Sequence, residues 1–436
     1  MNDVYLVEIR LGRTKWRVRQ TVVSIARAYG IEPFMERHPH VTLFGPMELL
    51  EGVSQQQLID AIGTVASHFD PVPFTLDGFE KREGMHGSVI AFSVRPSDSL
   101  TRLVAEIAGA LLPISRSHNA WDDRPELKWY HVTVANHLDQ KKASAVFQAL
   151  PGPDTDDGQL AQSGGFLSGL RTFFHSFFKS AEARYIRPLL IDETGLRITL
   201  MHGEEILAEY DLLEKRWLHD NHRHDSRSWQ ETLSRFRKHA GFEGAEPRNP
   251  GPGDTLLIAD LHLGHANIIR YCSRPFLFSD PGEMDRVLVA NWNASVPPGT
   301  RICHIGDLCH GRTARPEQEY REQLNGDITF ITGNHDAPGP GACSSTMIEH
   351  AGTRFCLVHD PADAPAAFDG WVVHGHHHNN DLRHYPFIDF EHRRINVSAE
   401  VAGYVPVSLE ETWTLVQYRL ASGNTKPVLL NYPYTE

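Results

Sequence analysis

The stretch TLLIADLHLGHANIIRYCSRPF, residues 255–276, opens with a short apolar run that ends in acidic and histidine residues. Residues 256–259 predict a buried strand, which would present Asp260 and His262 at its carboxyl end. Residues two apart in an extended chain place their side chains on the same face. The stretch therefore predicts a pair of side chains that can hold a metal ion.

Four more strand-like runs in the second half of the chain end in the same kinds of residue. Their ends read GD at 306–307, GNHD at 333–336, VHD at 358–360 and GHHH at 375–378. Carboxylate and amide oxygens mixed with imidazoles suit manganese, iron, zinc or nickel, and no thiolate is needed. We therefore expect the five strand ends to meet around metal ions.

The ordered set DLH, GD, GNHD, VHD and GHHH resembles the motifs of the calcineurin-like binuclear metallophosphoesterases, over residues 254–436. The resemblance implies two divalent ions, with manganese favoured and iron, zinc or nickel as alternatives. It implies these metal ligands: Asp260, His262 and His378 for one ion, Asn334, His359 and His376 for the other, and Asp307 as the bridge. It also implies that His335 protonates the leaving oxygen or orients the phosphate.

The first 150 residues contain one pattern twice, a helical stretch followed by a strand that bears His-Val-Thr. The two copies are 40–42 and 131–133, so they lie 91 positions apart (131 minus 40). In a strand, His40 and Thr42 share a face, as do His131 and Thr133. Two lobes that face each other would present two imidazoles and two hydroxyls to one phosphate.

This repeat resembles the two-histidine (2H) phosphoesterase superfamily, which includes 2′-5′ RNA ligase-like and cyclic phosphodiesterase proteins. The resemblance implies a two-lobed α+β fold and metal-independent opening of a cyclic phosphate. His40 and His131 would take and give protons, and Thr42 and Thr133 would donate to the phosphate oxygens. The motifs assign neither histidine to the base or to the acid.

The order of these features predicts two α/β domains. Strand-like segments from 185 to 212 resemble the closing strands of a 2H fold, and the Pro- and Gly-rich residues 246–253 indicate a linker. We therefore expect a 2H domain over 1–243, a linker over 244–253, and a metallophosphoesterase domain of α/β sandwich type over 254–436. Phenylalanines at helical spacing predict a helical or loop insertion near 151–183 within the first domain.

Composition limits the classes of partner. The chain has 42 Lys and Arg against 55 Asp and Glu, a formal charge of −13, which excludes a generic nucleic-acid coating protein. No basic leader or apolar run of membrane-spanning length is present in the sequence, so we expect a cytoplasmic protein without a membrane partner. The five cysteines lack the spacing of a zinc knuckle or a disulfide framework.

Together these features predict a bifunctional hydrolase for RNA or nucleotide end processing and RNA repair. The first domain would open a 2′,3′-cyclic phosphate to a 2′-phosphomonoester, and the second would hydrolyse that monoester. The expected partners are RNA with 2′,3′-cyclic phosphate or 2′-phosphate ends, or small nucleotides. The alternative is a metal-dependent nuclease or cyclic-nucleotide phosphodiesterase whose first domain only binds RNA.

Overall fold

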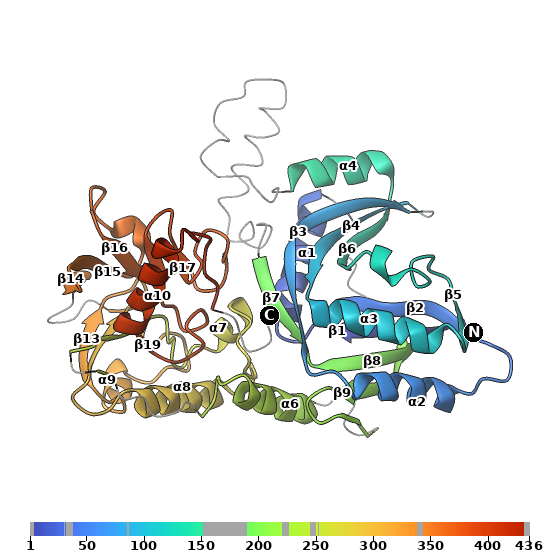
Figure 1. The fold of residues 1–436 in the computed structure, drawn as a ribbon, viewed down its shortest axis with the longest axis horizontal. Helices are drawn as coiled ribbons and strands as arrows, with labels where there is room; N and C mark the ends of the chain where they lie inside the picture. Colours follow the sequence, from blue (N-terminus) through green and yellow to red (C-terminus); the bar gives the residue numbers. More distant parts are fainter. Residues whose placement is uncertain are drawn as a thin grey trace. The chain divides into compact units, whose positions relative to one another are not determined.

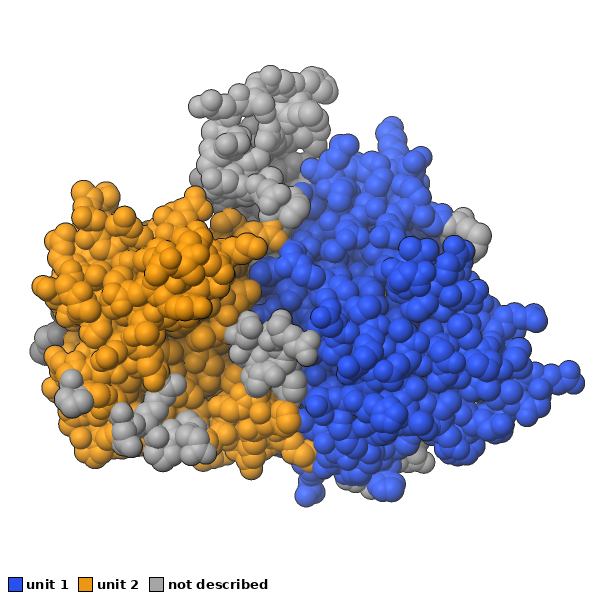
Figure 2. Space-filling view, in the orientation of Figure 1, with its two compact units in different colours: residues 1–232, 436 blue, residues 233–435 orange. Residues whose placement is uncertain are grey.

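The computed structural model describes residues 4–29, 31, 38–84, 87–150, 190–219, 226–244, 250–251, 253–337 and 343–430. The chain divides into two compact units, residues 1–232 with 436 (unit 1) and residues 233–435 (unit 2), shown in Figure 2. Both units mix helices with sheets, as the sequence predicts. The predicted insertion near 151–183 and residues 245–249 and 252 of the predicted linker lie outside the described residues.

The described residues of unit 1 form two antiparallel sheets (Figure 1). The first has the order β10 (Arg216–Trp217), β9 (Glu205–Asp211), β8 (Arg197–His202), β1 (Val4–Arg10), β2 (His40–Leu49) and β5 (Ser115–Ser117). The second has the order β6 (His131–Leu138), β4 (Gly87–Pro96), β3 (Val72–Gly84) and β7 (Leu190–Gly195). Each His-Val-Thr motif therefore begins a strand of a different sheet.

Helices connect and cover these sheets. They are α1 (Lys15–Tyr29), α2 (Gln55–Ala66), α3 (Asp98–Leu111) and α4 (Gln140–Ala149), with a 3₁₀ turn at Pro125–Leu127. Helix α2 begins at a capping box in which Ser54 accepts from the backbone of Gln57, and the Gln57 side chain accepts from the backbone of Ser54. Helices α2 and α3 lie side by side and bury their apolar faces in the core of the unit (Figure 1).

Two mixed sheets are formed by the part of unit 2 that the structure describes. One has the order β13 (Asp327–Ile331), β12 (Arg301–Ile305), β11 (Leu256–Ile258) and β19 (Val407–Ser408), and β11, β12 and β13 are parallel. The other has the order β14 (Ser345–His350), β15 (Thr353–Val358), β16 (Trp371–His374), β18 (Arg394–Asn396) and β17 (Ile388–Asp389), and β15, β16 and β18 are parallel. Ala259 exchanges backbone hydrogen bonds of 2.9 Å with Val397 and Ala399 at the end of β11.

The helices in the described residues of this half of the chain are α6 (Ser226–His239), α7 (Ala266–Tyr271), α8 (Pro281–Ser295), α9 (Glu317–Arg321) and α10 (Leu409–Ala421), with a 3₁₀ turn at Pro361–Asp363. Helix α6 begins in unit 1 and ends in unit 2. Ser408 caps α10 by accepting from the backbone of Glu411 over 3.0 Å. Within the described ranges, no helix is both long enough and apolar enough to pass through a bilayer.

Candidate functional site

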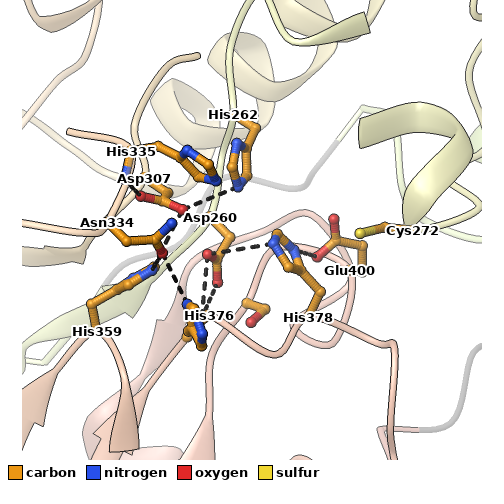
Figure 3. Close-up of polar contacts among 12 residues, drawn as sticks. Asp260, His262, Cys272, Asp307, Asn334, His335, His359, His376, His378 and Glu400 are labelled. Carbon is orange, nitrogen blue, oxygen red and sulfur yellow. Dashed lines mark hydrogen bonds and ion pairs between the residues drawn. The ribbon is translucent and has the colours of Figure 1, made fainter. Parts of the chain in front are cut away.

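The predicted metal ligands of unit 2 converge at the carboxyl ends of its parallel strands (Figure 3). Donor atoms of Asp260, His262 and His378 all lie within 4.8 Å of one another. Donor atoms of Asp260, Asp307 and His359 form a second such group. Parallel strands deliver their loops to one edge of a sheet, so residues far apart in sequence meet there.

The remaining predicted residues complete this cluster. Oδ1 of Asn334 lies 3.0 Å from Nε2 of His359 and 2.9 Å from Nδ1 of His376. Oδ2 of Asp307 lies 3.4 Å from Nε2 of His262 and 3.4 Å from Nε2 of His359. Asp307 therefore lies between His262 and His359, which the resemblance assigns to different ions, and this is the position expected of a bridging carboxylate.

His335 lies at the open side of the cluster. Its backbone N–H donates to Oδ1 of Asp307 over 2.9 Å, and its exposed ring is centred 5.5 Å from the ring of His262 (Figure 3). The structure thus brings together all eight residues that the resemblance implies for this site. The exposure of His335 leaves its ring accessible to a phosphoester at the cluster.

The backbone at this site is strained. Five of the seven predicted ligands have a left-handed φ although none is glycine: 59° at Asp260, 51° at His262, 59° at Asp307, 68° at His376 and 52° at His378. Such conformations cost roughly 1 to 3 kcal/mol each and persist where the surroundings enforce them. The strain aims neighbouring side chains at one point, which is typical of functional sites.

The motif glycines leave room for the carboxylates. A Cβ atom at Gly375 would lie 2.3 Å from Oδ2 of Asp260, and one at Gly333 would lie 2.2 Å from Oδ1 of Asp307. The backbone N–H of His376 donates to the same Oδ2 of Asp260 over 3.0 Å. Glycine is required at these two positions because the carboxylates lie against the backbone.

The donor set fits divalent cations. Nε2 of His262 is buried without a hydrogen-bond partner, and burial together with the charge of His378 holds the pKa of His262 well below its usual range. His262 therefore offers a lone pair that no described protein group uses. Burial would lower the pKa of His359, but Asp307 and Asp260 outweigh that effect and raise it to about 9, so the carboxylates attract positive charge into the cluster.

The sequence motifs did not identify three residues that support the predicted ligands. Asp336 accepts from the backbone N–H groups of Asp307 over 2.7 Å and Gly333 over 2.8 Å, and so joins the ends of β12 and β13. Glu400 accepts from Nδ1 of His378 over 3.1 Å, and Cys272 groups with His378 and Glu400 within ligand distance. The only sequence signal was the last letter of GNHD, because Cys272 and Glu400 lie outside the motifs.

The first His-Val-Thr motif lies on the face of its sheet that points away from the core. Ile9 and Val41 pair across β1 and β2 and are buried. The neighbouring pairs, Arg10 opposite His40 and Glu8 opposite Thr42, therefore project from the other face. Nδ1 of His40 donates to the carbonyl of His38 over 2.8 Å, which leaves Nε2 for a substrate.

The second motif has the same arrangement on the other sheet. His131 stands opposite Ser93 across β6 and β4, and its Nδ1 donates to the carbonyl of Trp129 over 3.0 Å. The Trp129 ring stacks on His131, with centroids 3.8 Å apart and planes 13° apart. Arg82 lies 4.6 Å from the Trp129 ring, and Nε1 of Trp129 donates to Glu80 over 2.7 Å. Trp129 is held in place and in turn restricts the imidazole.

His40 and His131 are close enough to interact electrostatically. Strands β2 and β6 are in contact, and His40 and His131 are both half-buried rather than enclosed. Burial and the positive charges of His40, Lys128 and Arg82 lower the pKa of His131 to about 4. Unit 1 therefore presents two imidazoles at one site, and one of them is neutral at physiological pH.

The fold and the two clusters define a protein built from two phosphoesterase modules. Residues 14–161 match the 2′-5′ RNA ligase superfamily, so the predicted resemblance of the N-terminal part to the 2H proteins is confirmed. The motif order and its convergence at the carboxyl ends of strands from both sheets define unit 2 as a calcineurin-like metallophosphoesterase domain with buried His and Asp clusters for metal ions.

The chain belongs to the same family as the uncharacterized protein MJ1445 of Methanocaldococcus jannaschii. The two are 45% identical over 163 residues, which cover 37% of this chain and 90% of the archaeal protein. The structure of Usb1 from Kluyveromyces marxianus is similar over 47% of this chain and 97% of the Usb1 chain. The sequence identity is 13% and the TM-score is 0.26. The structure of YfcE, a phosphoesterase from E. coli, is similar over 33% of this chain and 78% of the YfcE chain. The sequence identity is 18% and the TM-score is 0.20.

Proposed function

We propose that this protein processes RNA or nucleotide ends in two steps. Unit 1 opens a 2′,3′-cyclic phosphate to a 2′-phosphomonoester without metal, and unit 2 hydrolyses the monoester with divalent ions. The observation that carries the proposal is that His40 and His131 lie on strands in contact, in one chain with buried His and Asp clusters that could hold metal ions.

His131 suits the role of general base in the first step. Its lowered pKa keeps it neutral near pH 7, so that Nε2 can take a proton from water as the water oxygen attacks phosphorus. The bond from phosphorus to the 3′ oxygen breaks, and His40 gives its proton to that oxygen. The carboxylate of Glu8 lies 3.5 Å from Nδ1 of His40, the residue proposed as the acid.

Thr42 and Thr133 are the proposed hydrogen-bond donors to the non-bridging oxygens. Each shares the face of its histidine and is half-buried, so its hydroxyl can reach a phosphate held between the imidazoles. The donors are fixed before the reaction, so they stabilise the developing charge without reorganisation.

In the second step the proposed ligands are Asp260, His262, Asp307, Asn334, His359, His376 and His378. Two bound divalent ions would supply polarisation of the phosphate oxygens and a lowered pKa for a bound water. Manganese is the proposed native metal, with iron, zinc or nickel as alternatives. His335 is exposed beside the ligands, where its ring can protonate the 2′ oxygen as phosphate leaves. Because the modules share one chain, the product of the first step is concentrated near the second site.

Product analysis tests the sequence of steps. The substrate is an RNA oligonucleotide ending in a 2′,3′-cyclic phosphate, incubated with manganese or with EDTA. We expect EDTA to stop the reaction at the 2′-phosphate and manganese to carry it to a diol end with free phosphate. Asp307→Asn with manganese should also stop at the 2′-phosphate. If EDTA abolishes every change, the metal-dependent alternative, in which unit 1 only binds RNA, replaces this proposal.

A further inference from the structure

A group of cations beside His40 has no role in the proposed chemistry. Arg10 of β1 stands directly opposite His40 of β2, on the face that points away from the core. Such cross-strand pairs have Cβ atoms about 5 Å apart. Lys15 and Arg19 lie four residues apart in the first turns of α1 and therefore share one side of that helix.

These three residues form one cluster, which we call the Arg10 cluster (Arg10, Lys15 and Arg19). Burial lowers the pKa of Lys15 to about 8, and the charges of Arg19 and Arg10 add to that effect. The charges of all three cations act on His38, which precedes the His-Val-Thr motif by two residues. The cluster therefore lies at the edge of the site that contains His40.

Carboxylates in the described part of the chain offset only part of the charge of the Arg10 cluster. The charge of Glu209 acts on Arg10, but its carboxylate also lies 3.5 Å from Arg197. Nε of Arg10 lies 3.4 Å from Glu8, but the same carboxylate also faces His40 at 3.5 Å. Among the described residues, Lys15 and Arg19 have no ion pair with a carboxylate, and Nε of Arg10 and Nε of Arg19 are buried without a hydrogen-bond acceptor. Like charges held together and partly out of water cost free energy that a bound anion would offset.

We propose that the Arg10 cluster binds a backbone phosphate of the RNA strand whose terminal cyclic phosphate lies at His40 and His131. This inference rests on the proposed function of unit 1. Guanidinium and ammonium groups suit phosphate oxygens, because their N–H groups form short, charge-assisted hydrogen bonds. A local basic site also explains how a chain of net charge −13 can bind a polyanion. The cluster would favour oligonucleotides over cyclic mononucleotides, which lack this phosphate.

The test measures binding, so it depends on neither hydrolytic reaction. The full-length protein in EDTA is titrated against a fluorescein-labelled RNA tetranucleotide with a 3′-phosphate, and Kd is read from anisotropy at several salt concentrations. We expect Lys15→Gln and Arg19→Gln each to raise Kd about five- to tenfold and to reduce the slope of log Kd against log salt by about 0.7, as for one lost contact to a single strand.

Two further variants control the comparison. Lys15→Arg retains the charge and should bind within about twofold of the unmodified protein. Arg116→Gln removes an exposed cation opposite Glu48 on β2 and should leave both Kd and the salt slope unchanged. Arg116 pairs with a residue eight positions from His40, about 26 Å along the strand at 3.3 Å per residue. Melting curves of all variants establish that they are folded.

Three outcomes would overturn the inference. The first is an unchanged Kd and salt slope in Lys15→Gln and Arg19→Gln. The second concerns a tetranucleotide whose backbone linkages are uncharged methylphosphonates. If Lys15→Gln and Arg19→Gln still bind this molecule more weakly than the unmodified protein does, the cluster holds the terminal phosphate instead. The third is displacement of the labelled RNA, read by anisotropy, by inorganic phosphate as readily as by unlabelled RNA. Ring opening of a cyclic mononucleotide in EDTA tests the proposed function separately.

Discussion

Arg274 donates from Nε to Oε1 of Glu400 over 2.6 Å, and both side chains are fully buried. The same guanidinium donates to the carbonyls of Asp260 and Leu261, each over 2.7 Å. Glu400 in turn holds Nδ1 of His378, so this ion pair links the loop after β11 to the loop after β16. The hydrogen bond to Glu400 fixes the tautomer of His378 that carries its proton on Nδ1, and Nε2 then faces Asp260 at 3.8 Å.

We therefore expect Glu400→Gln to weaken metal binding about 10- to 100-fold, the usual cost of losing a partner that orients a ligand. The measurement is metal content by mass spectrometry after dialysis against graded EDTA. Glu410→Gln is the matched control, because Glu410 is exposed on α10 of the same unit. Equal metal retention by the two variants would show that Glu400 does not orient His378. Arg274→Met should instead destabilise the unit by about 3 to 5 kcal/mol, since it removes the guanidinium partner of a buried carboxylate.

The second prediction concerns Gly333→Ala. The new Cβ would overlap Oδ1 of Asp307, so either the carboxylate or the backbone must move. Overpacking of this kind costs about 1 to 3 kcal/mol. We expect the rise in melting temperature produced by manganese to shrink, because the displaced Asp307 binds the ion less well. Gly251→Ala, where nothing lies within 4 Å, should keep the full rise. An undiminished rise in Gly333→Ala would contradict the tight fit.

The third prediction concerns Trp129→Leu. The substitution removes the ring that stacks on His131 and the hydrogen bond to Glu80. We expect kcat for ring opening in EDTA to fall about tenfold, equivalent to about 1.4 kcal/mol, with little change in KM, because Trp129 orients the base. Trp121→Leu changes a partly exposed tryptophan of the same unit and should have no effect on kcat. A change in KM alone would indicate that Trp129 binds the substrate instead.

The fourth prediction concerns the titration of His131. Burial disfavours its charged form, and the positive charge of His40 adds to that effect, so its pKa of about 4 lies below the ordinary 6.5. His131 should therefore stay neutral as the pH falls from 8 to about 5 and take up its proton near 4. His40→Gln removes one positive neighbour and should raise the pKa. Nitrogen-detected NMR of the His131 imidazole gives the titration midpoint in the unmodified protein and in His40→Gln. A midpoint near 6.5 in the unmodified protein would exclude strong desolvation of His131.

The main sites were predictable because their signals are local in the chain. Apolar runs that end in Asp260, Asp307 and His359 follow from the strand period, and each His-Val-Thr copy places a histidine and a threonine on one face. The order of the five motifs was specific enough to imply every proposed ligand. Strand β5 and helix α4 were absent from the prediction, since Ser115–Ser117 has no apolar alternation and the periodicity of Gln140–Ala149 is weak.

The sequence by itself determined the two α/β modules, the two sets of chemical groups and the absence of a generally basic surface. Only the tertiary structure decided which distant residues support those groups: Glu400 behind His378, Trp129 against His131, and Arg10 opposite His40. The physical reason is that strand pairing and buried ion pairs depend on register and packing between segments far apart in the chain. A lone Arg or Glu carries no local pattern that reveals its partner.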